Sequence, residues 1–297
     1  MRFEMMTSQQ HSSQASPKAP PPCVEKQIDI GQREPLAARF YGRRQGAHGS
    51  PLVLHFHGGA FVGGSLEGGS SIAGLLAASG AVVMSLDYPL APAHPFPQAV
   101  EAGYGALVWA WKARHKLAGH DAPMFVAGEE AGGNIAAAVA LLARDRHGPA
   151  LAGQILLSPM LDPCLGTASL RDVHAGPVGC IWADGWHSYL PRLEDASHPY
   201  ATPGSVFRLS GLPPTLLITA EDDPLRDETQ AYAERLRAAG LFAHEAVLPG
   251  PTGWPCSYLE AGHDQAGWPA VVRKQFGDFF ASMSAAQNVQ SSLLSGP

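Results

Sequence analysis

The sequence predicts one doubly wound α/β domain built on a mostly parallel sheet. Short apolar segments that stop at Gly, Pro or acidic residues alternate along the chain with longer segments of helical pattern. The short segments are apolar throughout, which is typical of parallel strands that are covered on both faces. The composition agrees, because 45% of the 297 residues are hydrophobic and 15% are charged, so the chain can bury one large core.

Six strands are expected from these apolar segments, and most have a clear stop signal. The first ends at Gly58-Gly59, the third at Gly128 and the fourth at Pro159, while the fifth runs into an acidic loop. A further strand is expected near Gln27. The six segments are 51–57, 81–87, 124–127, 154–158, 215–219 and 242–248.

Four helices are expected between and after the strands. The first places its alanines on one stripe, and the second is rich in alanine throughout. The third has Pro224 in its first turn and stops at Gly240, a common arrangement at helix ends. The expected helices are 98–116, 131–145, 224–239 and 270–283.

Three segments lie outside this alternation. Residues 1–22 end in Ala-Pro-Pro-Pro and residues 285–297 are rich in Ser, Gln and Gly, so both are expected to be flexible. Residues 163–210 hold many Gly, Pro and aromatic residues. They are expected to form a reduced cap over the carboxyl edge of the sheet, where ligands bind in such folds. The single domain is therefore placed at residues 23–284.

Charge and composition exclude several classes of protein. The chain has 20 Lys and Arg against 26 Asp and Glu, a net charge of −6, so no nucleic-acid partner is expected. The sequence has no apolar run of about 18 residues and no apolar leader, which predicts a cytoplasmic protein without a membrane partner. Four cysteines without C-x-x-C spacing predict neither a disulfide scaffold nor a zinc module. No metal or other cofactor is expected, and a homodimer is left open.

The first candidate motif of the functional site follows the first strand. It begins His57-Gly58-Gly59-Ala60-Phe61. Two glycines in succession let backbone N–H groups face a cavity, where such donors can hold an oxyanion. On its own, a stretch of this kind is more typical of an ordinary connection between a strand and a loop.

The second motif, residues 128–134, joins the third strand to the alanine-rich helix. Gly128, Ala131 and Gly132 leave room for a sharp strand–turn–helix. In the G-x-S-x-G pattern of a nucleophile elbow, the Ser stands at the tip of such a turn. In this chain the tip is Glu130.

The third motif is the acidic loop after the fifth strand. Asp223 directly precedes Pro224, the start of an expected helix. Its side chain is interpreted either as a helix cap or as an acid at the edge of the sheet. Three motifs in this order, each at a strand end, are far more specific than any one of them.

On these stretches, together with 87–97 and 212–214, the chain resembles the hormone-sensitive-lipase family of α/β-hydrolases, particularly its bacterial esterases. The resemblance covers roughly residues 35–283. It implies the α/β-hydrolase fold, with a mostly parallel eight-stranded sheet and helices on both faces. It also implies an oxyanion hole made by Gly58, Gly59 and the N–H of Ala131, and it makes Asp223 the acid of a catalytic triad.

Two departures from the family pattern bear on function. Glu130 stands where the resemblance places the nucleophilic Ser, and residues 252–254 stand where it places the triad His. His263 is a displaced alternative if residues 251–261 form a local insertion, and a surface histidine is the other interpretation. Ordinary serine-esterase activity is therefore not expected.

Three functions remain open for Glu130. In the preferred one it is the general acid/base of a non-hydrolytic isomerase, dehydratase, lyase or cyclase that acts on a small apolar, perhaps polycyclic, carbonyl compound. In the second, its carboxylate fills the oxyanion hole of an inactive receptor or scaffold. In the third it is a nucleophile toward an epoxide and needs His263. The side chains expected to contact the ligand are Phe61, Glu129, Trp182, Trp186, Tyr189 and Trp254. For the three tryptophans and Tyr189, ordinary packing within the cap is the alternative interpretation.

Overall fold

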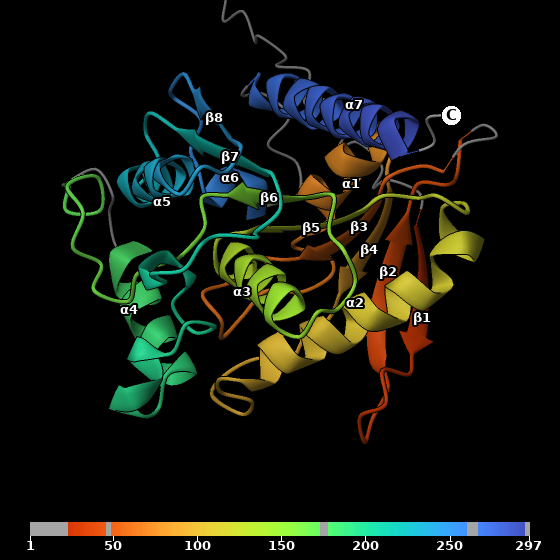
Figure 1. The fold of residues 1–297 in the computed structure, drawn as a ribbon. Helices are drawn as coiled ribbons and strands as arrows, with labels where there is room; N and C mark the ends of the chain where they lie inside the picture. The colour runs from red at the N-terminus through yellow and green to blue at the C-terminus, as the bar shows by residue number, and fades with distance from the viewer. Residues whose placement is uncertain (1–22, 46–48, 173–177, 260–266, 295–297) are drawn as a thin grey trace, which may run out of the picture.

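The computed structural model describes residues 23–45, 49–172, 178–259 and 267–294, arranged around one central sheet (Figure 1). The β1–β2 and β2–β4 pairs are antiparallel, and all other neighbouring strands are parallel. The mostly parallel eight-stranded sheet is as predicted. In sheet order its strands are β1 (Cys23–Ile28), β2 (Leu36–Tyr41), β4 (Val82–Leu86), β3 (Leu52–Phe56), β5 (Met124–Glu129), β6 (Gly153–Leu157), β7 (Thr215–Ala220) and β8 (Ala243–Leu248).

Helices cover both faces of this sheet. On one face α1 (Ser70–Ala78) and α7 (Trp268–Leu294) lie side by side, along the top of Figure 1. The other face carries α2 (Gln98–Leu117), α3 (Ala131–Asp145) and α5 (Arg226–Ala238). Because both faces are covered, the five strands from β3 to β7 are buried along their whole length.

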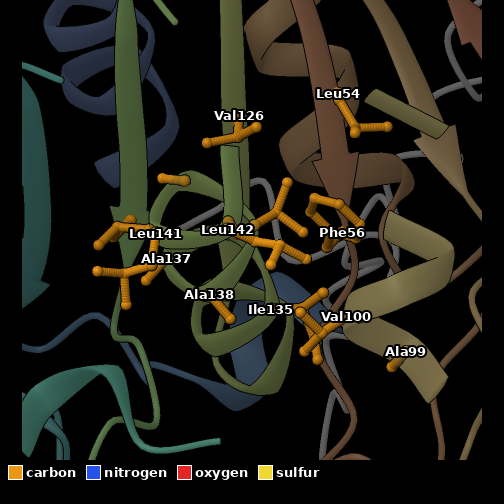
Figure 2. Close-up of a cluster of buried hydrophobic side chains, with 14 of the residues drawn as sticks. Leu54, Phe56, Ala99, Val100, Val126, Ile135, Ala137, Ala138, Leu141 and Leu142 are labelled. Atoms are coloured by element: carbon orange, nitrogen blue, oxygen red, sulfur yellow. The ribbon is translucent and has the colours of Figure 1, made fainter. Parts of the chain in front are cut away.

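Successive residues of each central strand enter two separate cores. Val53 of β3 packs in the core beneath α1 and α7, whereas Leu54 and Phe56 pack in the core beneath α2 and α3. Figure 2 shows part of the second core, with Phe56 and Val126 from the sheet and Ile135 from α3. This alternation explains why both sides of the strand must be apolar.

The ends of the chain differ from the sequence prediction. α7 extends to Leu294, well past the predicted end at residue 283, so most of the expected flexible tail 285–297 is helical. No Gly or Pro interrupts the sequence between Gly277 and Gly296, and the stretch is rich in good helix formers, which allows the helix to continue. The expected arm 1–22 lies outside the described residues. β2 and α1 were not predicted, because the first is half-exposed and the second follows a glycine-rich stretch.

The excursion 163–210 contains α4 (Val178–Tyr189) and two short 3-10 helices, Leu193–Ser197 and Pro203–Ser205. In Figure 1, α4 lies at the lower left, apart from the two helical layers. After β8 the chain forms α6 (Cys256–Leu259), a single helical turn. None of the helices in the described ranges combines the length and hydropathy needed to span a bilayer.

Candidate functional site

Glu130 lies at the tip of a sharp turn between β5 and α3. Its φ of 54° and ψ of −117° form a combination that residues other than glycine rarely adopt. The turn needs glycine on both sides: a Cβ atom on Gly128 would lie less than 3.0 Å from the backbone of Gly132, and one on Gly132 equally close to the backbone of Phe56. The close packing predicted for these glycines is confirmed, and it brings Glu130 up to the end of β3.

The Glu130 carboxylate lies against the glycine loop that follows β3. Its Oε2 accepts a hydrogen bond from the Gly59 N–H at 2.6 Å, and its Oε1 accepts one from the indole N–H of Trp182 in α4. The side chain is 3% exposed. Burial raises the pKa of Glu130, while the indole and the amides of Gly59 and Ala60 act in the opposite direction. Both carboxylate oxygens are therefore engaged by donors of the chain itself.

Glu129 holds the same loop from the end of β5. One of its oxygens accepts the Gly58 N–H at 3.2 Å, and the other lies 2.7 Å from Nε2 of His55. The other ring nitrogen of His55 lies 2.9 Å from the Ser85 hydroxyl, and all of these side chains are buried. The structure thus places Glu129 in the support of the glycine loop, and its expected role as a ligand contact stays a prediction.

His55 and Ser85 were not singled out in the sequence. The available signal was weak: each is a polar residue inside an otherwise apolar strand, β3 and β4 respectively. Because these strands are neighbours in the sheet and His55 pairs with Ser85 in register, the two side chains meet. Of the donors expected to form an oxyanion hole, Gly58 is bonded to Glu129 and Gly59 to Glu130, while Ala131 begins α3 and is fully buried.

Asp223 is buried at the end of β7. It accepts hydrogen bonds at 2.5 Å from the hydroxyls of Ser158 and Thr219, and at 2.9 Å from the N–H of Leu225. Burial raises the pKa of Asp223, and these three hydrogen bonds lower it. The helix-cap interpretation is wrong, because α5 begins at Arg226 with Leu225 as its N-cap and no side chain caps it. Asp223 instead lies at the edge of the sheet and holds the backbone turn that precedes the helix.

Glu228, in the first turn of α5, predicts a pH dependence of stability. It is buried, and its carboxyl accepts the N–H groups of Leu161 and Asp162. Burial raises the pKa of Glu228 from 4.5 to about 8. Between these values the folded protein keeps a proton that the unfolded chain has lost. The contribution of Glu228 to stability is therefore fully present below about pH 4.5 and is lost as the pH rises through about 8.

Urea unfolding at several pH values from 5 to 9 measures this effect. Each pH unit in the window lowers the free energy of unfolding by at most about 1.4 kcal/mol for one such group. We expect Glu228→Gln to flatten the decline, with a residual slope from Glu130 and Asp223, whose pKa values are also raised. Glu234→Gln, on the exposed side of α5, is the matched control and should follow the wild type. An unchanged slope in Glu228→Gln would contradict the assignment.

The aromatic residues of α4 divide into two groups. Trp182 reaches Glu130, as described above. Trp186 and Tyr189 instead pack on Phe61, with ring centroids 4.7 and 4.1 Å from its ring, and the Phe61 and Tyr189 rings are stacked. All four side chains are buried. For Phe61, Trp186 and Tyr189 the structure therefore shows the packing of the cap against the glycine loop.

The two buried tryptophans of α4 give a matched test of the Glu130 contact. Trp182→Phe removes the N–H that Glu130 accepts, which should lower the free energy of unfolding by about 1–3 kcal/mol beyond the loss of ring contacts. Trp186→Phe is the control, because the buried Nε1 of Trp186 has no hydrogen-bond partner among the described residues. The measurement is chemical denaturation of both variants at pH 7. Equal losses in the two variants would show that the indole N–H of Trp182 contributes nothing.

Trp254 lies on the other side of the sheet. Its ring packs edge-on against Tyr258 and Trp268, at centroid distances of 5.0 and 5.4 Å. It belongs to the core beneath α1 and α7. Trp254 is therefore a core residue that contacts Tyr258 of α6, and its expected role as a ligand contact stays a prediction. The path of the chain after β8 places Trp254 in this core, and no local sequence pattern indicates that path.

The loop after β8 is held by Asp222. This carboxylate accepts the N–H groups of Thr252 and Gly253 at 2.7 and 2.8 Å, and the Thr252 hydroxyl at 2.8 Å. These bonds lower the pKa of Asp222 against the effect of burial. The resemblance placed the triad histidine at this loop, and its displaced alternative, His263, lies outside the described residues.

Two residues of α6 complete the surroundings of Glu130, although the sequence did not single them out. A Cβ atom on Gly58 would lie 2.8 Å from Cδ2 of Leu259 and 2.7 Å from Oε2 of Glu130, so Leu259 covers the glycine loop. Tyr258 is 1% exposed. Burial raises the pKa of Tyr258 well above its ordinary value, and the charges of Glu130 and Asp223 add to this effect. Tyr258 is therefore a neutral phenol close to two acidic side chains.

The sheet order, the strand–turn–helix at Glu130 and the buried acid after β7 define a protein of the hydrolase type of α/β fold. A family model described as alpha/beta hydrolase fold matches residues 53–251, and the chain belongs to this family. A solved structure of a hyperthermophilic esterase from the archaeon Pyrobaculum calidifontis superposes with a TM-score of 0.72 at 35% identity, over 90% of this chain and 86% of that one. The fold implied by the resemblance is thereby confirmed.

Relatives with different names match the same share of the chain. Carboxylesterase NlhH of Mycobacterium tuberculosis is 39% identical over 200 residues, which are 64% of this chain and 62% of that protein. Gibberellin receptor GID1B of Arabidopsis thaliana is 32% identical over 202 residues, which are 64% of this chain and 56% of that protein. The chain therefore spans less than two thirds of the length of these relatives.

Proposed function

We propose that this chain is a non-hydrolytic member of its family that binds a small molecule, as a receptor or scaffold. The contact that carries the proposal is the 2.6 Å hydrogen bond from the Gly59 N–H to Glu130. A serine hydrolase needs such donors free for the oxyanion that forms when the ester is attacked. In our proposal Glu130 stands at the nucleophile position, and its carboxylate takes the place of that oxyanion.

The arrangement of the acids supports this proposal. Asp223 accepts three hydrogen bonds from the chain itself, and Glu130 accepts from both Gly59 and Trp182. Carboxyl groups that already accept hydrogen bonds from fixed donors of the protein stabilise the structure in the absence of a ligand. Among the relatives, the gibberellin receptor supports a binding role, whereas the carboxylesterase is named for hydrolysis.

A second candidate is the non-hydrolytic enzyme in which Glu130 moves protons at a carbonyl compound. The observation that favours it is the raised pKa of Glu130, because a carboxyl that titrates nearer to neutral pH is a better general acid or base. This is the candidate that the sequence favoured. The nucleophile mechanism requires a histidine, His263, that lies outside the described residues, and no contact in the described part of the chain favours it.

Exchange of the α-protons of 2-indanone in D2O, followed by proton NMR, separates the two candidates. We expect saturation-transfer signals that show binding of the ketone to the wild type, with deuterium incorporation no faster than in buffer. Glu130→Gln, which keeps the size of the side chain and accepts from one of its two N–H donors, should also bind the ketone without added deuterium incorporation. Incorporation by the wild type that is lost in Glu130→Gln would establish the acid/base enzyme instead. Absence of any saturation transfer would reject the binding role.

A further inference from the structure

A cavity of about 280 Å³ opens at the amino edge of the sheet, the edge opposite to Glu130. Met124, the first residue of β5, lines this cavity, whereas Glu130 directly follows the last residue of the same strand. A strand of 6 residues is about 20 Å long. The cavity is therefore separate from the site proposed above.

The floor of this cavity is apolar. Its lining includes Pro123 and Met124, where β5 begins, and Leu151 in the segment that leads into β6. The volume lies just below the range of about 300–1,000 Å³ for small-molecule sites, which restricts a ligand to one or two rings. An apolar floor of this size favours the body of a small organic molecule over an inorganic ion.

Arg114, in the last turn of α2, is the fixed cation of this cavity. Its guanidinium carbon lies 3.8 Å from the centroid of the Trp111 ring, and its Nη1 donates to the Trp111 carbonyl at 2.9 Å. In the described part of the chain no carboxylate forms an ion pair with Arg114. A guanidinium held flat in this way keeps its N–H groups in a rigid fork, which matches the geometry of a carboxylate.

A histidine pair and one acid lie at the rim of the cavity. Nδ1 of His120 lies 2.8 Å from Oδ1 of Asp121, and the His120 ring packs edge-on against His115, with centroids 5.4 Å apart. Asp121 is exposed and lines the same cavity as Arg114. A ligand with a single negative charge is therefore favoured over a doubly charged phosphate, which Asp121 would repel twice as strongly.

The surroundings of the cavity are basic. Residues 42–45 and 111–122 lie together at this edge of the sheet. A Cβ atom on Gly119, for example, would lie 3.3 Å from Nε of Arg44. These two segments hold five Lys and Arg against one acid, in a chain whose net charge is −6. Basic residues in the last turn of a helix offset its dipole, but Arg43 and Arg44 belong to no helix, so the excess attracts anions to this edge.

We infer that this cavity is a ligand site, and that its ligand is a small monocarboxylate whose apolar body has one or two rings. The carboxylate accepts from the guanidinium of Arg114, and the rings lie on Met124 and Leu151. The inference goes beyond the proposed function, because it concerns the opposite edge of the sheet and a charged ligand.

Three naphthalene probes that differ in one group test this inference: 2-naphthoate, 2-naphthamide and 2-naphthyl phosphate. Their affinities for the full chain are measured by isothermal calorimetry at pH 7 and low salt. For the wild type we expect the carboxylate to bind at least about tenfold more tightly than the amide, the effect of a hydrogen bond to a charged group. The phosphate should bind no more tightly than the carboxylate, and about 0.5 M NaCl should weaken carboxylate binding.

Two variants locate the ligand. Arg114→Gln removes the cation and should lower the affinity for 2-naphthoate at least about tenfold. Arg146→Gln is the matched control, because Arg146 also lies over a ring, that of Tyr104 at 5.0 Å, but is paired with Glu101 and does not line the cavity. Ala150→Trp fills the cavity without changing any charge, since Ala150 is an exposed lining residue, and it should abolish the binding of 2-naphthoate. The Tm of each variant is measured alongside.

The outcomes separate this site from the site at Glu130. Equal losses in Arg114→Gln and Arg146→Gln would show attraction to net charge alone and overturn the inference. So would binding of 2-naphthoate that survives in Ala150→Trp, or displacement of 2-naphthoate by 2-indanone, because either result places the acid elsewhere. An amide that binds as tightly as the carboxylate overturns the assigned class of ligand. If 2-naphthoate does not bind to the wild type, the inference is rejected and the proposed function stands.

Discussion

The wild-type protein is expected to hydrolyse p-nitrophenyl acetate and p-nitrophenyl butyrate no faster than buffer. Esterases typically turn over roughly once per second or faster, so the expected deficit is large and easily measured. Attack on an ester needs a hydroxyl nucleophile, a histidine base and free oxyanion donors. The tip of the turn is Glu130, which has no hydroxyl, and the Gly59 donor is already bonded to its carboxylate.

Release of p-nitrophenolate, followed at 405 nm, checks this prediction. Glu130→Ser supplies the missing hydroxyl and frees Gly59, yet we expect its rate to stay within about tenfold of buffer, because a hydroxyl without a base is a weak nucleophile. Ser158→Ala is a useful control, since the Ser158 hydroxyl is a candidate nucleophile near the site and is bonded to Asp223. Esterase-like turnover by the wild type would refute the proposal. A large gain in Glu130→Ser would show that His263 reaches the site.

Gly132→Ala is expected to prevent folding. Its new Cβ atom would lie less than 3.0 Å from the backbone atoms of Phe56 and His57, which belong to β3 and the loop that follows it. Backbone in the middle of a sheet cannot move aside as a flexible side chain can. We expect a loss of at least about 4–5 kcal/mol, a large part of the total stability of a typical domain.

Circular dichroism and urea unfolding of the soluble fraction measure this loss, together with the yield of soluble protein. Gly277→Ala is the matched control: no atom lies within 4 Å of its added Cβ, and Gly277 is inside α7. Alanine favours helix over glycine, so this control should gain up to about 1 kcal/mol. Similar stability of the two variants would mean that α3 does not pack closely on the end of β3.

Several features of the fold were predictable because the signal for each is local. Continuous apolar segments between turn residues predicted β3 to β8, since a strand covered on both faces requires apolar residues on both sides. The spacing of Gly128 and Gly132 placed Glu130 at the tip of a sharp turn, because only small residues fit there. The end of α7 was placed too early, since polar helix formers resemble a flexible tail until the helix is formed.

The partners of Glu130 were not predictable in the same way. Trp182 was expected near the site, but its hydrogen bond to Glu130 depends on how α4 packs over the glycine loop. The His55–Glu129 pair depends on the neighbouring positions of β3 and β5. The place of Trp254 in the core beneath α1 and α7 depends on the path of the chain after β8. Periodicity and residue spacing report only local geometry, whereas hydrogen-bond partners are set by contacts between segments that are far apart in the sequence.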